Sequence, residues 1–291
     1  MNGVRRLEYV AKFDGKADDI LEAEGISSTI RTGLRKRFGA ICKITSEIET
    51  PIRIIDYVSC GERICIYIQD DNIKPIPKWD MPVKIVYEDE DLAVIDKSAG
   101  VAVIPVKNHY GRSLANALAN VWTDFVYRPV NRLDRDTSGL MIVAKNQLSH
   151  SRLSSSHIER EYVALCEGHF CGDEVGLIDK PIKRITGDGM KRCVAQDGDR
   201  AITHYRVLNQ YGEYFSCEFS LETGRTHQIR VHISYLGYPL CCDRLYNPNC
   251  RPIVCPNGKM LDRQALHSKR ISFIHPIDGR EMEFFSSPEF L

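Results

Sequence analysis

The polar loop NRLDRDTSG (131–139) carries the side chains of this chain that are best suited to chemistry. It places two arginines, two aspartates, a threonine and a serine between two apolar, strand-like runs. Polar loops held by rigid strands often carry catalytic or binding groups, although an ordinary turn held by side-chain hydrogen bonds has the same composition. In an extended chain Asp134 and Asp136 would point the same way. Their spacing alone does not decide which of them is the reactive carboxylate.

A second candidate is the segment TGRTHQIRVH (223–232), which reads as the start of a helix. At about 100° per residue, Ile229 and Ile233 fall on one apolar stripe, and His227 and Arg230 fall together on a neighbouring polar sector. An arginine beside a buried stripe usually has a carboxylate partner or an anionic ligand. The alternative is a surface arginine whose stem packs along the helix.

A third segment, REYVALCEGHF (160–170), begins a strand with Arg160, Glu161 and Tyr162. A tyrosine at the start of a strand is more often half-buried packing than a catalytic group. On its own, therefore, Tyr162 is a weak candidate for contact with a substrate.

Cysteine usage indicates a reduced compartment. The chain has 11 cysteines, and its charged first residues, MNGVRRLEYVAKFDG, contain no apolar signal core. We therefore expect free thiols and a cytoplasmic location. Four cysteines cluster at Cys241, Cys242, Cys250 and Cys255, but they lack the paired C-x-x-C pattern of structural zinc sites, so we predict no metal.

The overall charge is balanced, with 39 basic and 39 acidic residues. A zero net charge argues weakly against nucleic acid as a partner, but the distribution is uneven, because no acidic residue lies between Glu24 and Glu47. The candidate RNA-binding patch in this interval comprises Arg31, Arg35, Lys36, Arg37 and Lys43. A solvated helix face would explain the same run. The chain has no apolar run of about 18 residues, so no membrane helix is expected.

Proline and hydrophobic patterns divide the chain into three parts. Residues 1–74 are expected to form a small accessory module, 75–82 a proline-rich linker and 83–291 the main domain. The module should contain helices at Ala17–Glu24 and Ser28–Phe38 and strands at Ala40–Ile44 and Arg63–Ile68.

The main domain is expected to be α+β, with a mixed and largely antiparallel sheet, because strands outnumber helices without alternating regularly with them. The helices are predicted at Leu114–Trp122, Gln147–His157 and His227–Leu236. The predicted strands are Val83–Tyr87, Leu92–Asp96, Val101–Pro105, Val126–Val130, Leu140–Ala144, Tyr162–Cys166, Thr203–Asn209 and Tyr214–Leu221.

Five motifs of the main domain, NRLDRDTSGL, REYVALCEGHF, GDRAITHY, LETGRTHQIRVH and RQALHSKRISFIHP, resemble in this order those of the RluA-type family of RNA pseudouridine synthases. The resemblance runs from about Val83 to the C-terminus and implies the pseudouridine synthase fold. It also implies that Asp134, not Asp136, is the catalytic residue, with Tyr162 and Arg230 beside it. Asn131 stands where the family commonly has histidine, which puts local RNA contacts in doubt. The N-terminal module resembles a degenerate form of the RNA-binding module of the fourth small-subunit ribosomal protein.

This resemblance implies that uridine in ribosomal or transfer RNA is converted to pseudouridine. The C1′–N1 bond is broken, the base rotates, and C1′ is rejoined to C5, a sequence that needs no cofactor. An ionised Asp134 could attack C1′ or remove the 2′ proton, and the sequence does not distinguish these routes. Arg230 would stabilise the carboxylate, and Tyr162 would stack on the flipped uracil and could assist loss of the C5 proton. The remaining substrate-binding candidates are Arg132, Thr137, Arg225, His227 and Ile229. RNA is the implied partner, with no obligate protein partner.

Two other functions fit parts of the pattern. A catalytically inactive RNA-binding protein of the same fold would be expected to lose Asp134, Tyr162 or Arg230, and all three are present. A glycosidase would need a second carboxylate as acid–base partner, and no second carboxylate lies in a comparable motif.

Overall fold

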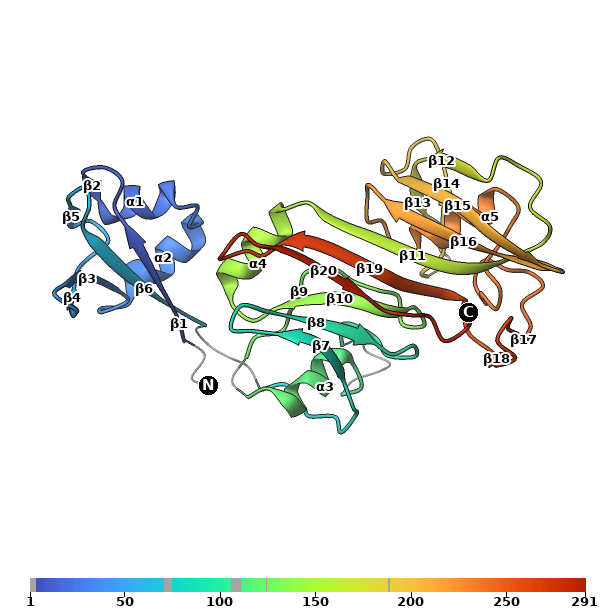
Figure 1. Cartoon of the computed structure of the whole chain (residues 1–291), viewed down its shortest axis with the longest axis horizontal. Helices are drawn as coiled ribbons and strands as arrows, with labels where there is room; N and C mark the ends of the chain where they lie inside the picture. The colour runs from blue at the N-terminus through green and yellow to red at the C-terminus, as the bar shows by residue number, and fades with distance from the viewer. Residues whose placement is uncertain (1–3, 71–74, 106–110, 124, 188) are drawn as a thin grey trace.

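Two large β-sheets organise the chain. In Figure 1 the smaller one lies at the left, and the larger one runs from the centre to the right. The computed structural model describes residues 4–70, 75–105, 111–123, 125–187 and 189–291. No helix within these ranges has the length and apolar character needed to cross a membrane.

The N-terminal module is a four-stranded antiparallel sheet with two helices packed on it. The strand order is β1 (Val4–Val10), β6 (Arg63–Gln69), β3 (Ile41–Thr45) and β4 (Ile48–Pro51). The helices are α1 (Ala17–Ala23) and α2 (Ser28–Lys36), and β2 (Gly15–Lys16) pairs with β5 (Tyr57–Val58).

The two helices of this module were predictable because their apolar residues recur with the period of a helix. Ile30 and Leu34, one turn apart on α2, are both buried in the module core together with residues of α1 and β6. Both expected helices and both expected strands are present to within about two residues. Strand β1 was not predicted, because Leu7 is its one buried residue and its charged neighbours hide the alternation.

The main sheet contains ten strands, and its β10–β19 pair is parallel while the other paired neighbours among the described strands are antiparallel. This confirms the predicted mixed, largely antiparallel sheet. In spatial order the strands are β12 (Val175–Asp179), β15 (Ile202–Tyr211), β16 (Tyr214–Leu221), β11 (Ile158–Glu167), β19 (Leu266–Ile274), β10 (Ser138–Ala144), β8 (Leu92–Lys97) and β7 (Lys84–Glu88), with β20 (Glu281–Phe285) on β19 and β9 (Arg128–Pro129) on β10.

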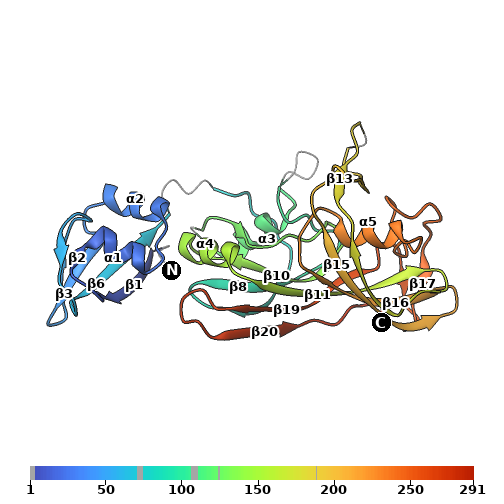
Figure 2. The ribbon, with the colours of Figure 1, turned by 90° about the horizontal axis from the view of Figure 1, so that it is seen from above.

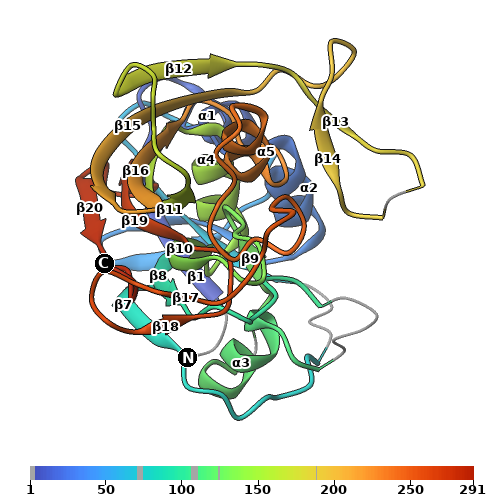
Figure 3. The same cartoon turned by 90° about the vertical axis from the view of Figure 1, so that its right-hand side faces the viewer.

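Three helices accompany the main sheet: α3 (Leu114–Val121), α4 (Gln147–Ser155) and α5 (Gln228–Tyr235). Helices α3 and α5 bury their apolar stripes in one core cluster with side chains from β8, β10, β11 and β16. Figure 2 shows both helices on one side of the strands, and Figure 3 shows the sheet curving around α5. Two short hairpins complete the fold: β13 (Ile182–Arg184) with β14 (Arg192–Val194), and β17 (Ile253–Val254) with β18 (Met260–Leu261).

Two predicted strands are wrong as written. Within Val101–Pro105 the structure has a single bridge, between Ala102 and Ser113, and Val126–Val130 is reduced to the two residues of β9. Both segments contain a proline, which has no N–H to donate to a neighbouring strand.

Candidate active site

The loop 131–139 and helix α5 meet at an ion pair. Arg230 on α5 donates from Nη1 to Oδ2 of Asp134, with the two atoms 2.7 Å apart. Asp134 keeps a quarter of its side chain exposed, whereas the Arg230 side chain is only 8% exposed. The carboxylate of Asp134 is therefore accessible to solvent, whereas Arg230 lies in the protein interior.

Asp243 holds the inner side of Arg230. It accepts hydrogen bonds from Nε at 2.7 Å and from Nη2 at 2.8 Å, and it is fully buried. Burial opposes the charge on the guanidinium, but the contacts with Asp243 and Asp134 raise the pKa of Arg230 above its usual value. Such a two-pronged contact fixes the plane of the guanidinium as well as its position. Arg230 can therefore present one N–H to Asp134 without rotating away.

Asp243 is not among the residues that the sequence motifs indicate. It lies directly after Cys241 and Cys242, in a segment whose sequence signal is its cysteines. The signal that could have found it is the apolar setting of Arg230, because a buried arginine requires carboxylate partners.

Tyr246 and His227 also contact the ion pair between Arg230 and Asp134. The Tyr246 ring lies 5.0 Å from Cζ of Arg230, and its hydroxyl is 2.9 Å from Nδ1 of His227. The other ring nitrogen of His227 is 3.7 Å from Oδ2 of Asp134. Burial lowers the pKa of His227, so the imidazole is neutral near pH 7. His227 also has a left-handed backbone (φ 59°), a conformation that non-glycine residues rarely adopt outside functional or tightly determined positions.

A C-terminal segment clamps the loop that carries Asp134. Gln264 donates to the Thr137 hydroxyl at 2.6 Å, and Arg263 donates to the carbonyl of Asp136 at 3.0 Å. Gly139 makes the close approach possible, because a Cβ built there would lie 2.3 Å from the carbonyl oxygen of Ser268. The parallel pairing of β10 with β19 starts at this point. The motifs NRLDRDTSGL and RQALHSKR therefore contact each other, and the second holds the loop of the first in place.

Known proteins resemble this chain over most of its length. The model of the RNA pseudouridylate synthase family matches residues 91–235. The uncharacterised RNA pseudouridine synthase YjbO of Bacillus subtilis is 42% identical over 212 residues, which cover 70% of this chain and 72% of that protein. The ribosomal large subunit pseudouridine synthase D of Escherichia coli K12 is 36% identical over 241 residues, covering 77% and 72%.

The chain belongs to the RNA pseudouridine synthase family. Among solved structures, the human RNA pseudouridylate synthase domain containing 1 superposes with a TM-score of 0.59 at 24% identity, covering 74% of this chain and 87% of that one. This similarity supports the fold. The chain is thus an isomerase that acts on RNA, as its sequence motifs indicate.

Lys97 of the synthase is buried close to the same loop. Its Nζ lies 2.8 Å from the carbonyl of Ser98, 3.0 Å from that of Val101 and 3.0 Å from that of Arg135. Burial lowers the pKa of Lys97 to about 7, yet three carbonyl acceptors require three N–H donors, which only the charged ammonium supplies. Lys97 therefore ties the loop to the end of β8.

Tyr162 lies near the start of β11, between Phe219 of β16 and Ser268 of β19 in the sheet register. It is 5% exposed and belongs to the same core cluster as Ile229 of α5. Burial raises the pKa of Tyr162, so its hydroxyl stays protonated at neutral pH. Because a protonated hydroxyl is a poor proton acceptor, this position suits stacking against a base better than removal of a proton.

The other predicted substrate-binding residues fall into two groups. Arg132 and Arg225 are exposed, and Nε of Arg225 donates to the carbonyl of Arg200 at 3.0 Å. Thr137 and Ile229 are 2% and 4% exposed. Substrate contact by these two remains a prediction, which their burial disfavours.

Asn131 does not face the surface. It is 8% exposed, and its Oδ1 accepts a hydrogen bond from the N–H of Ile142 on β10 at 2.8 Å. An effect of Asn131 on local RNA contacts stays a prediction. The side chain supports the strand that follows the loop.

Asp136, the alternative carboxylate, points elsewhere. It receives two hydrogen bonds from its neighbour Arg135, at 3.0 and 2.9 Å. Asp243, the other nearby carboxylate, is fully committed to Arg230. Neither offers Asp134 the free acid–base partner that a glycosidase requires.

Three members of the predicted RNA-binding patch are paired within their own module. Arg31 contacts Asp18 at 2.8 Å and Glu22 at 2.6 Å, Arg35 contacts Asp18 at 3.3 Å, and Lys43 contacts Glu62 at 2.6 Å. Lys36 and Arg37 make no ion pair with a carboxylate of the described residues. The patch is therefore much less positive than its sequence indicates.

The cysteine cluster at 241–255 consists of free thiols. Burial raises the pKa of Cys241 and Cys242, and Cys242 donates to the carbonyls of Arg251 and Leu261 at 3.1 and 3.3 Å. Protonated thiols that already donate to carbonyls are poor metal ligands. Residues of this segment, among them Arg244, Cys250 and Arg251, line a cavity of about 730 Å³.

Proposed function

We propose that this synthase converts a uridine of large-subunit ribosomal RNA into pseudouridine, with Asp134 as its catalytic carboxylate. The observation that carries the assignment of Asp134 is its 2.7 Å contact with Arg230, on a carboxylate that remains partly exposed. The ribosomal substrate is supported by the relative named ribosomal large subunit pseudouridine synthase D. Transfer RNA is the alternative substrate, since the same motifs serve both.

The proposed reaction conserves atoms and electrons. The C1′–N1 bond breaks, the detached uracil turns, and a C1′–C5 bond forms. The C5 proton then leaves and N1 acquires one, so no oxidant or cofactor is needed. Asp134 acts either by bonding to C1′ or by removing the 2′ proton, and both routes use its ionised form.

Each neighbouring group has a role in this proposal. Arg230 offsets the negative charge of Asp134 and is itself held by Asp243. Tyr162 supplies a flat apolar surface against which the flipped uracil can stack. Arg132 and Arg225 are exposed cations suited to phosphate contacts. We place the enzyme in the cytoplasm, which its 11 free cysteines and the proposed ribosomal substrate support.

The test uses large-subunit ribosomal RNA transcribed with tritium at C5 of uridine. Because the C5 hydrogen is lost during isomerisation, turnover releases tritium into water. Mapping of pseudouridine in total RNA from cells with and without the gene then identifies the position. Release from transfer RNA, with none from ribosomal RNA, would replace the proposed substrate by the alternative.

A further inference from the structure

After β20 the chain continues as segment 286–290, which has the sequence SSPEF. Figure 1 shows it near the start of β19, where the C-terminus is marked. The N–H of Ser286 donates to the carbonyl of Lys269 on β19 at 2.8 Å, and Phe290 is fully buried in a core cluster of the same domain. Both ends of the segment are therefore fixed to the catalytic domain.

Arg263 joins this segment to the loop 131–139. Oε1 of Glu289 accepts from Nε of Arg263 at 2.9 Å and from Nη2 at 2.6 Å, and the Phe290 ring lies 5.8 Å from Cζ. On the loop side, Nη1 donates to the carbonyl of Asp136 and Nη2 donates to the hydroxyl of Ser138, both at 3.0 Å. The Arg263 side chain is only 14% exposed. One planar guanidinium therefore sets the distance between the segment and the loop.

A second connection from the segment to the loop runs through His267. Burial lowers the pKa of His267, so the imidazole is neutral near pH 7 and carries one N–H. The hydroxyl of Ser286 donates to Asp96 at 2.8 Å and therefore accepts from Nε2 of His267 at 3.1 Å. Nδ1 is left to accept from the Ser138 hydroxyl at 2.9 Å. The Ser138 oxygen accepts from Arg263 while its proton is donated to His267, so this side chain has a single orientation.

The loop residues held in this way directly follow Asp134. The N–H of Thr137 donates to the carbonyl of Asp134 at 3.2 Å, which closes a turn over residues 134–137. A shift of the Ser138 end of the turn would therefore move the Asp134 carboxylate relative to Arg230, from which it is 2.7 Å away. A misplacement of about 1 Å can reduce a rate about hundredfold.

We propose that segment 286–290 positions the loop that carries Asp134, and that Arg263 is the positioning residue through which it acts. The inference rests on the proposed catalytic role of Asp134. The segment keeps the carboxylate in one orientation toward Arg230 and toward the ribose of the flipped uridine. It affects the rate of the chemical step, whereas binding of RNA does not depend on it.

The test measures kcat and KM of variants of the whole chain by tritium release. Arg263→Lys keeps the charge but loses the fork that reaches Glu289 and the loop together. We expect its kcat to fall about hundredfold with KM unchanged. Glu289→Ala should lower kcat about tenfold in the unaltered enzyme and have no further effect in Arg263→Lys, because the connection is already lost there. Glu289 is 59% exposed at the side chain, so its replacement should leave folding intact.

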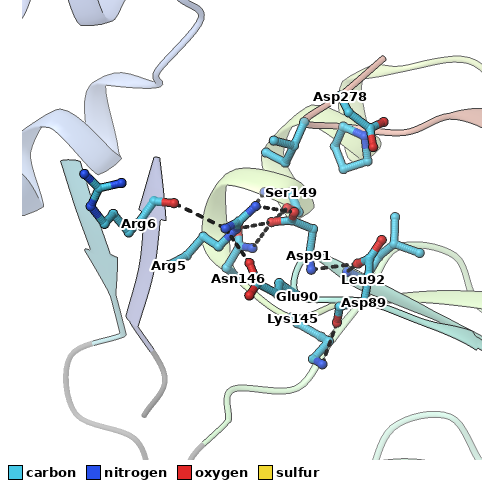
Figure 4. Close-up of polar contacts among 12 residues, drawn as sticks. Arg5, Arg6, Asp89, Glu90, Asp91, Leu92, Lys145, Asn146, Ser149 and Asp278 are labelled. Carbon is cyan, nitrogen blue, oxygen red and sulfur yellow. Dashed lines mark hydrogen bonds and ion pairs between the residues drawn. The ribbon is translucent and has the colours of Figure 1, made fainter. Parts of the chain in front are cut away.

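Arg5→Lys is the matched control. Arg5 is also largely buried, at 22% exposed, and a distant carboxylate also holds it, because Asp91 accepts from Nε and Nη2 at 2.9 Å each. Figure 4 shows this contact, with Asn146 donating to the same carboxylate. Among the described residues, the hydrogen bonds of Arg5 do not include the loop 131–139. Arg5→Lys should therefore lose stability but keep its kcat.

Hydrogen exchange of the loop amides measures the same effect without a substrate. The Thr137 amide should exchange about tenfold faster in Arg263→Lys and Glu289→Ala than in Arg5→Lys. Equal exchange in the three variants would overturn the proposal, as would equal losses of kcat in Arg263→Lys and Arg5→Lys. A loss from Glu289→Ala that is the same with and without Arg263→Lys would also contradict it. If the unaltered enzyme releases no tritium from either RNA, the proposed function is rejected, and exchange still decides the role of the segment.

Discussion

The centre around Asp134 and the basic segment of the N-terminal module are both clusters of charged residues, yet they are built differently. At the centre, one buried arginine is shared by two carboxylates that lie 96 and 13 residues away in sequence. In the basic segment, Arg31 and Arg35 pair with acids of the neighbouring helix α1, close to solvent. The first arrangement depends on the whole fold, and the second is local.

This difference shows that charge density in sequence is a poor guide to charge available for binding. Five cations between residues 31 and 43 predict a strongly positive patch, but carboxylates outside the interval neutralise three of them. At the active centre a single cation serves two anions, and burial makes each contact stronger. Position in the fold, and not composition, separates the two regions.

Of the substitutions that test this comparison, that of Asp134 should reduce activity most. Asp134→Asn removes the nucleophile or base but keeps the shape, so pseudouridine formation should fall to background while RNA binding persists. Tritium release and RNA binding by the same preparation measure both properties. Asp136→Asn is the control, because its partner Arg135 is on the surface, and it should keep most of the activity. Turnover by Asp134→Asn would refute the assignment.

Asp243→Asn should have the next largest effect. Arg230 would lose the charge that fixes its plane, and a small displacement of a positioning group can reduce a rate about hundredfold. Removing one partner of a buried pair should also lower the free energy of unfolding by about 3 kcal/mol. The matched control is Asp262→Asn, which breaks an exposed pair with Arg244.

The readout that separates positioning from simple instability is the pH profile of kcat. If Asp243 acts through Arg230 and Asp134, the acidic limb of the profile should move in Asp243→Asn at a temperature where the variant is folded. A folded variant with reduced kcat and an unmoved profile would leave Asp243 with a purely structural role.

Much of this architecture could be predicted from the sequence, and the omissions have physical causes. Periodicity located α2 and α5, and motif order located Asp134, because both signals are contained in contiguous residues. Asp243 escaped detection because its role is set by a contact across 13 residues with no regular spacing. The neutralisation of Arg31 and Arg35 likewise depends on the packing of two helices, which a local charge count does not report.

Gly139→Ala tests whether the loop needs its close contact with β19. The added Cβ would lie 2.3 Å from the Ser268 carbonyl oxygen, at a φ of 107°. We expect a loss of about 3 kcal/mol in the free energy of unfolding, from overpacking and backbone strain together. Gly279→Ala is the control, because it has φ 74° but no atom within 4 Å. Denaturant titration should show a clearly smaller loss there, and equal losses would assign the effect to backbone strain alone.

The smallest expected effect is that of Arg35→Gln, and it tests the other side of the comparison. Arg35 is 60% exposed at the side chain and pairs with Asp18 at 3.3 Å. An exposed pair of this kind contributes about 0–1 kcal/mol, so stability should change by less than about 1 kcal/mol. Because its charge is already matched by Asp18, RNA affinity and the salt slope should stay close to those of the unaltered enzyme. If the basic segment instead acts as one positive field, Arg35→Gln would lower the salt slope by about one unit. That is the change expected for Lys36→Glu, because Lys36 has no carboxylate partner among the described residues. A salt titration of the two variants side by side therefore decides whether pairing within the module removes a cation from RNA binding.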